Sequence, residues 1–229
     1  MRMLARDRGL LTETVIRGRR VTLRHASEGF SEEDIARRYR WSLDQELQYW
    51  SGSIPAAPTL AQFRSDIIAS TRQLDARRDQ FAVLKEDGEL IGMVSYYNWT
   101  PERGQAELGV YIGERGLWDR GYGTEAIRTL LDHLYQTTRL RAMYLNTYAT
   151  NERARASYNK IGFETVGTMR KYSSRIGYYI DVQMRITRED FIGRYGLGAF
   201  APKPSPSPLP PGPSGQPSRQ HDGRAPFPR

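Results

Sequence analysis

Apolar and polar positions alternate along several short stretches of the chain, and this period of two predicts strands. Between two of these stretches stands Glu86-Asp87-Gly88, an Asp-Gly turn of the kind that closes a β-hairpin. The expected strands cover residues 15–24, 80–85, 89–99, 107–112, 141–148, 164–174 and 178–186. Elsewhere apolar residues recur every three or four positions. This spacing predicts helices at residues 31–42 and 59–78, and another that carries Ile127, Leu130 and Leu134 on one face.

The stretch from Glu107 to Tyr135 combines a strand, a glycine-rich turn and a helix. Gly121 and Gly123 allow the backbone to approach a ligand closely, and the first amides of the helix lack intrahelical partners. We therefore expect a phosphate-bearing ligand at this turn. Gly121-x-Gly123-x-x-Ala126 fits a relaxed dinucleotide fingerprint, but no acid closes the strand at 141–148 to hold a ribose, and no Gly-Lys-Ser/Thr follows. A nicotinamide site and a P-loop are both disfavoured.

A second motif, Asn151-x-x-Ala154-x-x-x-Tyr158-x-Lys160-x-Gly162-Phe163, follows the strand at 141–148. Asn151 suits a helix N-cap and Gly162 a left-handed C-cap. Together with Arg120-Gly121-Tyr122-Gly123-Thr124, this run resembles the GNAT superfamily of N-acetyltransferases over roughly residues 16–188. Within the superfamily it looks most like the branch of ribosomal-protein N-terminal acetyltransferases and spermidine acetyltransferases.

The resemblance implies an α/β fold of the α+β type. It has a mixed, mostly antiparallel central sheet flanked by helices and splayed at the acyl-CoA site. It also implies acetyl-CoA as co-substrate, no metal, a primary-amine acceptor, and a plausible homodimer. The acceptor is either a protein N-terminal α-amine or a polyamine. An acidic region at residues 28–46 is compatible with a polyamine, although the same acids suit helix starts and an ordinary surface.

Cofactor-binding residues follow from the same resemblance. They are Trp118, Asp119, Arg120, Gly121, Tyr122, Gly123 and Thr124 around the phosphates, Asn151 at the pantetheine arm, and the backbone of Val110, Tyr111 and Ile112 near the acetyl oxygen. Trp118 departs from the glutamine or arginine that is commoner in the family, so it is expected either to stack on the cofactor or to pack beneath the loop. Gly109 suits a local irregularity such as a bulge.

Two residues are expected to be catalytic. Tyr158 is assigned to protonating the leaving thiolate, against the alternative of an ordinary core tyrosine. Glu107 is assigned as the base that neutralises the amine, against the alternative of a buried salt bridge or hydrogen bond. Tyr49 and Trp50 are expected to touch substrate or to pack against the sheet. Because the chain has no cysteine, direct attack in a ternary complex is expected.

The composition of the chain bears on metal binding, cellular location and nucleic-acid binding. The 229 residues carry a net charge of +8, and the three histidines are too scattered to suggest a metal site. No membrane-spanning run or signal peptide is recognised, so a cytoplasmic location is expected. No nucleic-acid partner is expected, because no aromatic-and-basic module is visible.

The predicted organisation is a flexible arm at 1–14, the acetyltransferase domain at 15–196 and a Pro-rich disordered tail at 197–229. The tail is expected to be solvated, with docking to an aromatic groove as the alternative reading. The alternative function is a non-catalytic acyl-CoA-binding or sensor module with a partner-docking tail.

Overall fold

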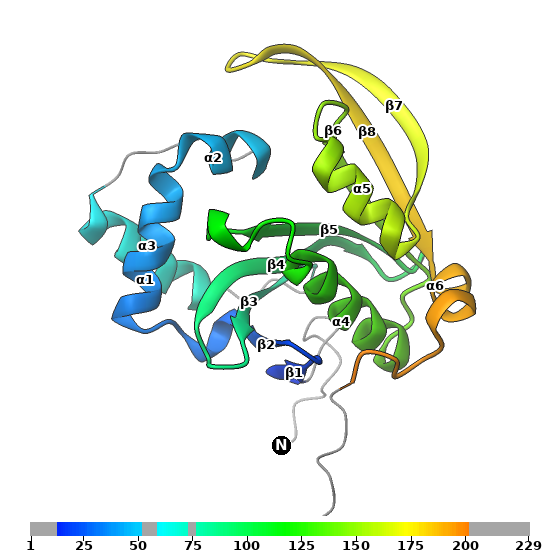
Figure 1. Cartoon of the computed structure of the whole chain (residues 1–229), viewed down its shortest axis with the longest axis horizontal. Coiled ribbons are helices and arrows are strands. Elements are labelled where there is room, and N and C mark those ends of the chain that lie inside the picture. The colour runs from blue at the N-terminus through cyan, green and yellow to red at the C-terminus, as the bar shows by residue number, and fades with distance from the viewer. Residues whose placement is uncertain (1–12, 52–58, 73–76, 202–229) are drawn as a thin grey trace, which may run out of the picture.

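A single eight-stranded sheet runs through the computed structural model, which describes residues 13–51, 59–72 and 77–201 (Figure 1). The strand order is β1-β2-β3-β4-β5-β6-β8-β7, and every neighbouring pair is antiparallel except β5 and β6. The strands are β1 (Val15–Arg17), β2 (Val21–His25), β3 (Asp79–Lys85), β4 (Leu90–Thr100), β5 (Gln105–Ile112), β6 (Ala142–Tyr148), β7 (Glu164–Ser173) and β8 (Gly177–Thr187). The mixed, mostly antiparallel sheet expected from the sequence is confirmed.

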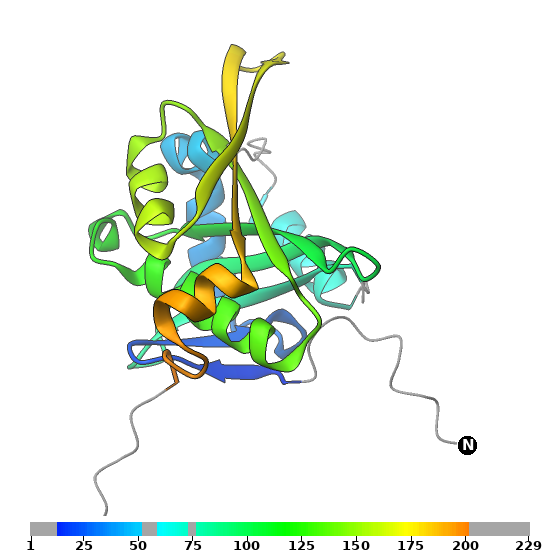
Figure 2. The same ribbon diagram turned by 90° about the vertical axis from the view of Figure 1, so that its right-hand side faces the viewer.

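Helices cover both faces of this sheet. One face packs on α4 (Tyr122–Thr137), whose Ile127, Leu130 and Leu134 are buried in the larger core, and on α6 (Arg188–Tyr195). The other face packs on α1 (Glu32–Leu43) and α2 (Gln45–Ser51) through a smaller core that contains Trp41 and Leu47. The remaining helices are α3 (Leu60–Arg72), α5 (Glu152–Ile161) and the short 3-10 turns η1 (Ala26–Glu28) and η2 (Arg115–Leu117). Figures 1 and 2 show the β7–β8 hairpin projecting beyond the rest of the sheet.

The sheet opens between β5 and β6. Their parallel pairing covers only Gln105–Glu107 and Ala142–Tyr144, although both strands continue further. The Gly113 N–H donates to the Ile91 carbonyl of β4 (2.8 Å). From there back along β5, every second residue directs its N–H toward β4 and the residues between direct theirs away from it. The N–H groups of Val110 and Ile112 therefore point away from β4, into the opening. The predicted splay is present, and it leaves backbone donors facing it.

Three local expectations are corrected. The stretch at 15–24 is two strands rather than one, because the chain turns at Gly18, whose N–H donates to the Val21 carbonyl (2.8 Å). The helix expected at 59–78 ends at Arg72, residues 73–76 lie outside the described residues, and Arg77 and Arg78 lead into β3. Gly109 sits in regular register opposite Ser95. The irregularity lies in β4 instead, between Tyr97 and Thr100.

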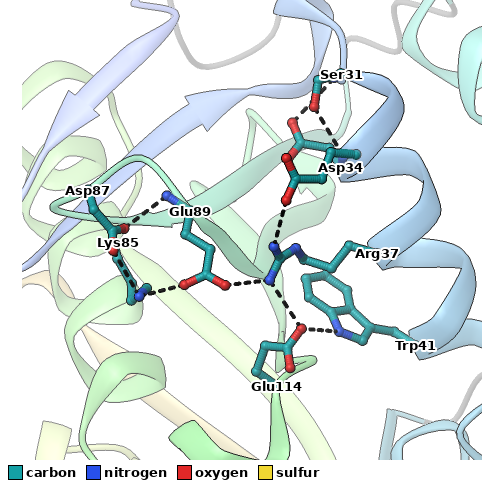
Figure 3. A network of polar contacts seen from close by, with 9 residues as sticks. Ser31, Asp34, Arg37, Trp41, Lys85, Asp87, Glu89 and Glu114 are labelled. Carbon is teal, nitrogen blue, oxygen red and sulfur yellow. Dashed lines mark hydrogen bonds and ion pairs between the residues drawn. The ribbon is translucent and has the colours of Figure 1, made fainter.

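A network of charged side chains fixes α1 against the end of β5 (Figure 3). The Arg37 guanidinium donates to Glu89 (2.5 Å) and to Glu114 (3.4 Å), and Glu89 also accepts from Lys85 (2.5 Å). The Trp41 indole donates to the same Glu114 oxygen (3.1 Å). Because Glu114 is the second residue after β5, these bonds hold one wall of the opening in place.

Both ends of the described chain extend past the predicted domain limits. Thr14 is bonded to β2, since its carbonyl accepts from the His25 N–H (2.7 Å). The Asp132 carboxylate accepts the N–H groups of Gly198 (2.8 Å) and Phe200 (3.1 Å), so residues 197–201 belong to the folded body rather than to a tail. The rest of the predicted arm and tail, residues 1–12 and 202–229, lies outside the described residues.

Candidate active site

A cavity of about 430 Å³ occupies the opening between β5 and β6. It is walled by β5, the segment from η2 into α4, the end of β6, α5, and the C-terminal end of α2. Most residues expected at the site line it: Trp50, Val110, Tyr111, Ile112, Trp118, Asp119, Gly121, Tyr122, Gly123, Thr124, Asn151 and Tyr158. Glu107, Arg120 and Tyr49 were expected at the site but are not on its wall.

The glycine turn presents backbone donors to the cavity. Gly121 has φ +83 and ψ 0, a left-handed conformation that only glycine adopts without strain, and α4 begins at the next residue. The N–H groups of Tyr122, Gly123 and Thr124 have no acceptor among the described residues, as expected for the first turn of a helix. The Thr124 hydroxyl pairs with that of Ser157 (2.6 Å) and so joins α4 to α5. This cluster of free donors at the positive end of α4 fits a pyrophosphate.

Trp118 connects this turn to β5. Its indole N–H donates to the Ile112 carbonyl (2.7 Å), and its ring packs against the smaller core that contains Leu47. The Arg153 guanidinium lies over the same ring, 3.9 Å from the centroid. Of the two readings open for Trp118, packing beneath the loop agrees with these contacts, although the side chain also faces the cavity.

Tyr158 enters the cavity from α5. The helix starts at Asn151, which is buried and whose side-chain oxygen accepts the Ala154 N–H (3.2 Å), and it ends at the left-handed Gly162. The Tyr158 ring packs near Phe163, with centroids 6.0 Å apart. Burial, and secondly the neighbouring Tyr97, raises the pKa of Tyr158 to about 12. The phenol therefore stays protonated at neutral pH and is available as a proton donor.

Glu107 lies at the point where β5 and β6 part, beside the cavity rather than in its wall. One carboxylate oxygen accepts from the Asn98 amide (2.8 Å) and the other from the Asn146 amide (3.1 Å). These donors come from β4 and β6, so the carboxylate is fixed between the two strands that flank β5. In this structure Glu107 is therefore held by hydrogen bonds, which was the alternative to its role as the base. Each carboxylate oxygen still keeps a second lone pair.

Aromatic side chains bridge the two sides of the opening near its mouth. Tyr49 and Trp50 of α2 pack at a tilt against Tyr148 at the end of β6, with ring centroids 5.5 and 6.5 Å from that of Tyr148. Tyr148 in turn meets Tyr179 of β8 edge-on at 5.0 Å. Tyr49 thus packs within this cluster, whereas Trp50 both packs and lines the cavity.

Several cavity residues were not anticipated from the sequence. Arg153, Ser157 and Lys160 line the cavity from one face of α5, and their spacing of four and three residues could have indicated this shared face. Asn146 and Tyr97 belong to strands whose facing is set by pairing, so no local pattern singled them out.

The predicted acidic region does not face the cavity. Glu32 pairs with Arg64 (2.5 Å), and Asp34 pairs with Arg24 (3.0 Å). Arg115 binds both Asp44 (2.5 Å) and Glu46 (2.6 Å), which lowers the pKa of Asp44. Arginines thus pair with these four acids, which agrees with the alternative that the acidic region is an ordinary charged surface.

Comparison with known proteins agrees with the two motifs. The sequence matches the family model described as an acetyltransferase (GNAT) domain over residues 20–164. The chain belongs to the GNAT acetyltransferase family. It is 27% identical over 167 residues to the uncharacterized N-acetyltransferase p20 of Bacillus licheniformis, covering 72% of this chain and 90% of p20. Aminoglycoside N(6')-acetyltransferase type 1 of Klebsiella pneumoniae is 24% identical over 168 residues, covering 69% of this chain and 83% of that protein.

A solved structure shares the fold. The spermidine N-acetyltransferase of Vibrio cholerae, in complex with CoA and spermine, has a TM-score of 0.65 at 18% identity and covers 76% of this chain and 98% of that chain. The family resemblance and the enzyme class predicted from the motifs are confirmed: this GNAT protein is an N-acetyltransferase that takes acetyl-CoA as co-substrate.

Among the residues that the structure describes, no group of three or more histidine, cysteine or acidic side chains could hold a metal ion. In the same residues, no helix is both long enough and apolar enough to cross a membrane.

Proposed function

We propose that this GNAT enzyme acetylates the α-amino group of a peptide or protein by direct attack in a ternary complex. The observation that carries the choice of acceptor is the charge of the cavity wall. Asp119, in the glycine turn, is the sole carboxylate among the described residues that line the cavity, while Arg153 and Lys160 make the wall basic. A polyamine carries several positive charges, and this wall offers it few counter-charges.

The ionisation of the amine supports the same choice. An α-amino group has an ordinary pKa of about 8, so an appreciable fraction is already neutral near pH 7.5. An alkyl amine with a pKa of about 10 is almost wholly protonated at that pH and has no free lone pair. With both oxygens of Glu107 already accepting amide N–H groups, an acceptor that loses its proton easily suits this site better.

Direct attack rests on the absence of a suitable nucleophile. The sequence has no cysteine. Ser157, which lines the cavity, shares its hydroxyl with Thr124 rather than with a base. The amine nitrogen is then the group that attacks the thioester carbonyl.

The proposal assigns a group of the protein to each step of the reaction. The first amides of α4 would hold the pyrophosphate of CoA, whose thioester supplies the acetyl group. The N–H groups of Val110 and Ile112 would donate to the carbonyl oxygen as it gains charge. Tyr158 donates its proton to the leaving sulfur, and Glu107 is the final acceptor of the proton from the amine.

The test is acetyl-CoA-dependent thiol release against a panel of acceptors. The panel holds peptides that differ in their first residue, the same peptides with a blocked α-amine but a free internal lysine, spermidine, spermine and an aminoglycoside. We expect turnover on peptides with a free α-amine and none on the blocked ones. Turnover on polyamines or aminoglycosides alone would overturn the choice of acceptor. Binding of acetyl-CoA without turnover on any amine would favour the non-catalytic sensor instead.

Replacing Tyr158 by Phe tests whether Tyr158 is the general acid that protonates the leaving sulfur. Loss of general acid catalysis should lower turnover by roughly 10²-fold or more, while the affinity for CoA stays unchanged because the ring and its packing remain. Tyr172→Phe, on the exposed part of the β7–β8 hairpin, is the matched control. Unchanged turnover in Tyr158→Phe would remove Tyr158 from this role.

A further inference from the structure

Tyr97 is placed between the cavity and Glu107. It is the one β4 residue among those that line the cavity. It pairs directly with Glu107 across the β4–β5 ladder. Directly opposed residues point to the same face of a sheet, with Cβ atoms about 5 Å apart. Glu107 does not reach the cavity wall; two cavity-lining side chains lie beside it, Tyr97 on the same face of the sheet and Asn146, which donates to it (3.1 Å).

The Tyr97 ring lies against Gly109 of β5. A Cβ at Gly109 would lie 3.4 Å from Cε1 of Tyr97 and 2.9 Å from the Ser95 hydroxyl. The phenol therefore lies along the face of β5 over Gly109, next to the backbone of Val110. This is also where β5 turns unpaired donors toward the opening, so the ring and these donors border one part of the cavity.

The groups that face Tyr97 come from three elements. They are Glu107 of β5, Asp181 of β8, which is paired with Lys171 of β7 (2.5 Å), and Tyr158 of α5. Burial first, and then the charges of Glu107 and Asp181, raise the pKa of Tyr97, so its hydroxyl keeps its proton at neutral pH. Neither Tyr97 nor Tyr158 has a hydrogen-bond partner for its hydroxyl among the described residues. Two protonated phenols thus border the same cavity, one from β4 and one from α5.

We propose that Tyr97 is a catalytic residue that contacts the acceptor nitrogen and passes its proton toward Glu107. Before the attack, the Tyr97 oxygen accepts one proton from the ammonium form of the acceptor, which frees the nitrogen lone pair. Tyr97 gives its own proton to the Glu107 carboxylate, directly or through one water. The nitrogen then forms the bond to the acetyl carbon, and when the carbon–sulfur bond breaks, its electron pair stays on sulfur, which takes the proton of Tyr158. The second proton of the nitrogen restores Tyr158 by way of solvent, and Glu107 releases its proton to solvent, so the two protons lost by the ammonium balance the one gained by sulfur and the one released.

This inference rests on the proposed function, because it assigns a residue to the acceptor side of the same reaction. The experiment compares Tyr97→Phe, Glu107→Gln and the double variant with the parent enzyme, and uses Tyr172→Phe as the control. Tyr97→Phe keeps the ring over Gly109 and removes only the hydroxyl. We expect kcat/KM for the amine to fall roughly 10- to 100-fold, with an unchanged Kd for CoA. The double variant should lose no more kcat/KM than the more impaired of the two single variants, because both residues serve one path of proton transfer.

A pH profile separates this role from a structural one. The deficit of Tyr97→Phe should shrink as the pH rises past the pKa of the acceptor amine, where the amine needs no help in losing its proton. A loss of less than about twofold, a loss that is independent of pH, or multiplying losses in the double variant would each overturn the role of Tyr97 while leaving the acetyltransferase assignment intact. A parent enzyme that binds CoA but acetylates no amine would overturn the proposed function, and the role of Tyr97 with it.

Discussion

Replacing Trp118 by Phe tests how the glycine turn that we propose binds CoA is held in place. The substitution keeps an aromatic ring in the smaller core but removes the indole N–H that donates to the Ile112 carbonyl at 2.7 Å. That bond joins the turn to the end of β5. Without it, the turn can leave the position in which the first amides of α4 face the cavity.

The magnitude follows from the bond that is lost. A hydrogen bond of this kind contributes about 1 kcal/mol net, and an acceptor left without its donor raises the cost to about 2 kcal/mol. The smaller ring also attracts the Arg153 guanidinium, now 3.9 Å from the indole centroid, more weakly. If the whole effect falls on the CoA-competent conformation, the Kd for CoA should rise roughly 5- to 30-fold.

Isothermal titration with CoA measures the affinity, and thermal unfolding of the free protein measures the accompanying loss of stability. Trp99→Phe provides the matched control, because Trp99 packs on the larger core and does not line the cavity. A Kd for CoA within twofold of the parent value would refute the reasoning, since it would mean that the glycine turn holds its position without the tryptophan.

The remaining predictions concern pH and packing. Because burial raises the pKa of Tyr158 to about 12, a pH–rate profile of kcat should show no alkaline loss of the acid below about pH 10; an apparent pKa under that value would contradict the assignment. The raised pKa also means that the neutral phenol stabilises the fold below about pH 10 and that this stability is lost as the pH rises toward 12. Gly113→Ala would place a Cβ 2.1 Å from the buried Trp41 ring and should lower the free energy of unfolding by about 1–3 kcal/mol, measured in urea. Gly116→Ala, which meets nothing within 4 Å, should leave it nearly unchanged, and equal effects of the two alanines would refute the packing argument.

The sequence alone determined the elements whose signals are local. Asn151 and Gly162 cap α5 as predicted, because capping depends on residues within one helical turn. Gly121 takes the left-handed conformation that ends the turn before α4, since few other residues tolerate it. These two motifs were sufficient for the family. The end of α3 was predicted less well, because helix boundaries carry weaker local signals than helix faces.

Tertiary structure decided which side chains meet. Tyr97 and Glu107 are ten residues apart, and only the register of β4 on β5 puts them on one face and leaves Glu107 behind the cavity wall. The pairing of Asp44 with Arg115 joins residues 71 positions apart and removes the acidic wall that the sequence suggested. Such pairings depend on how strands and helices pack at long range, and alternation along one strand carries no information about the strand beside it.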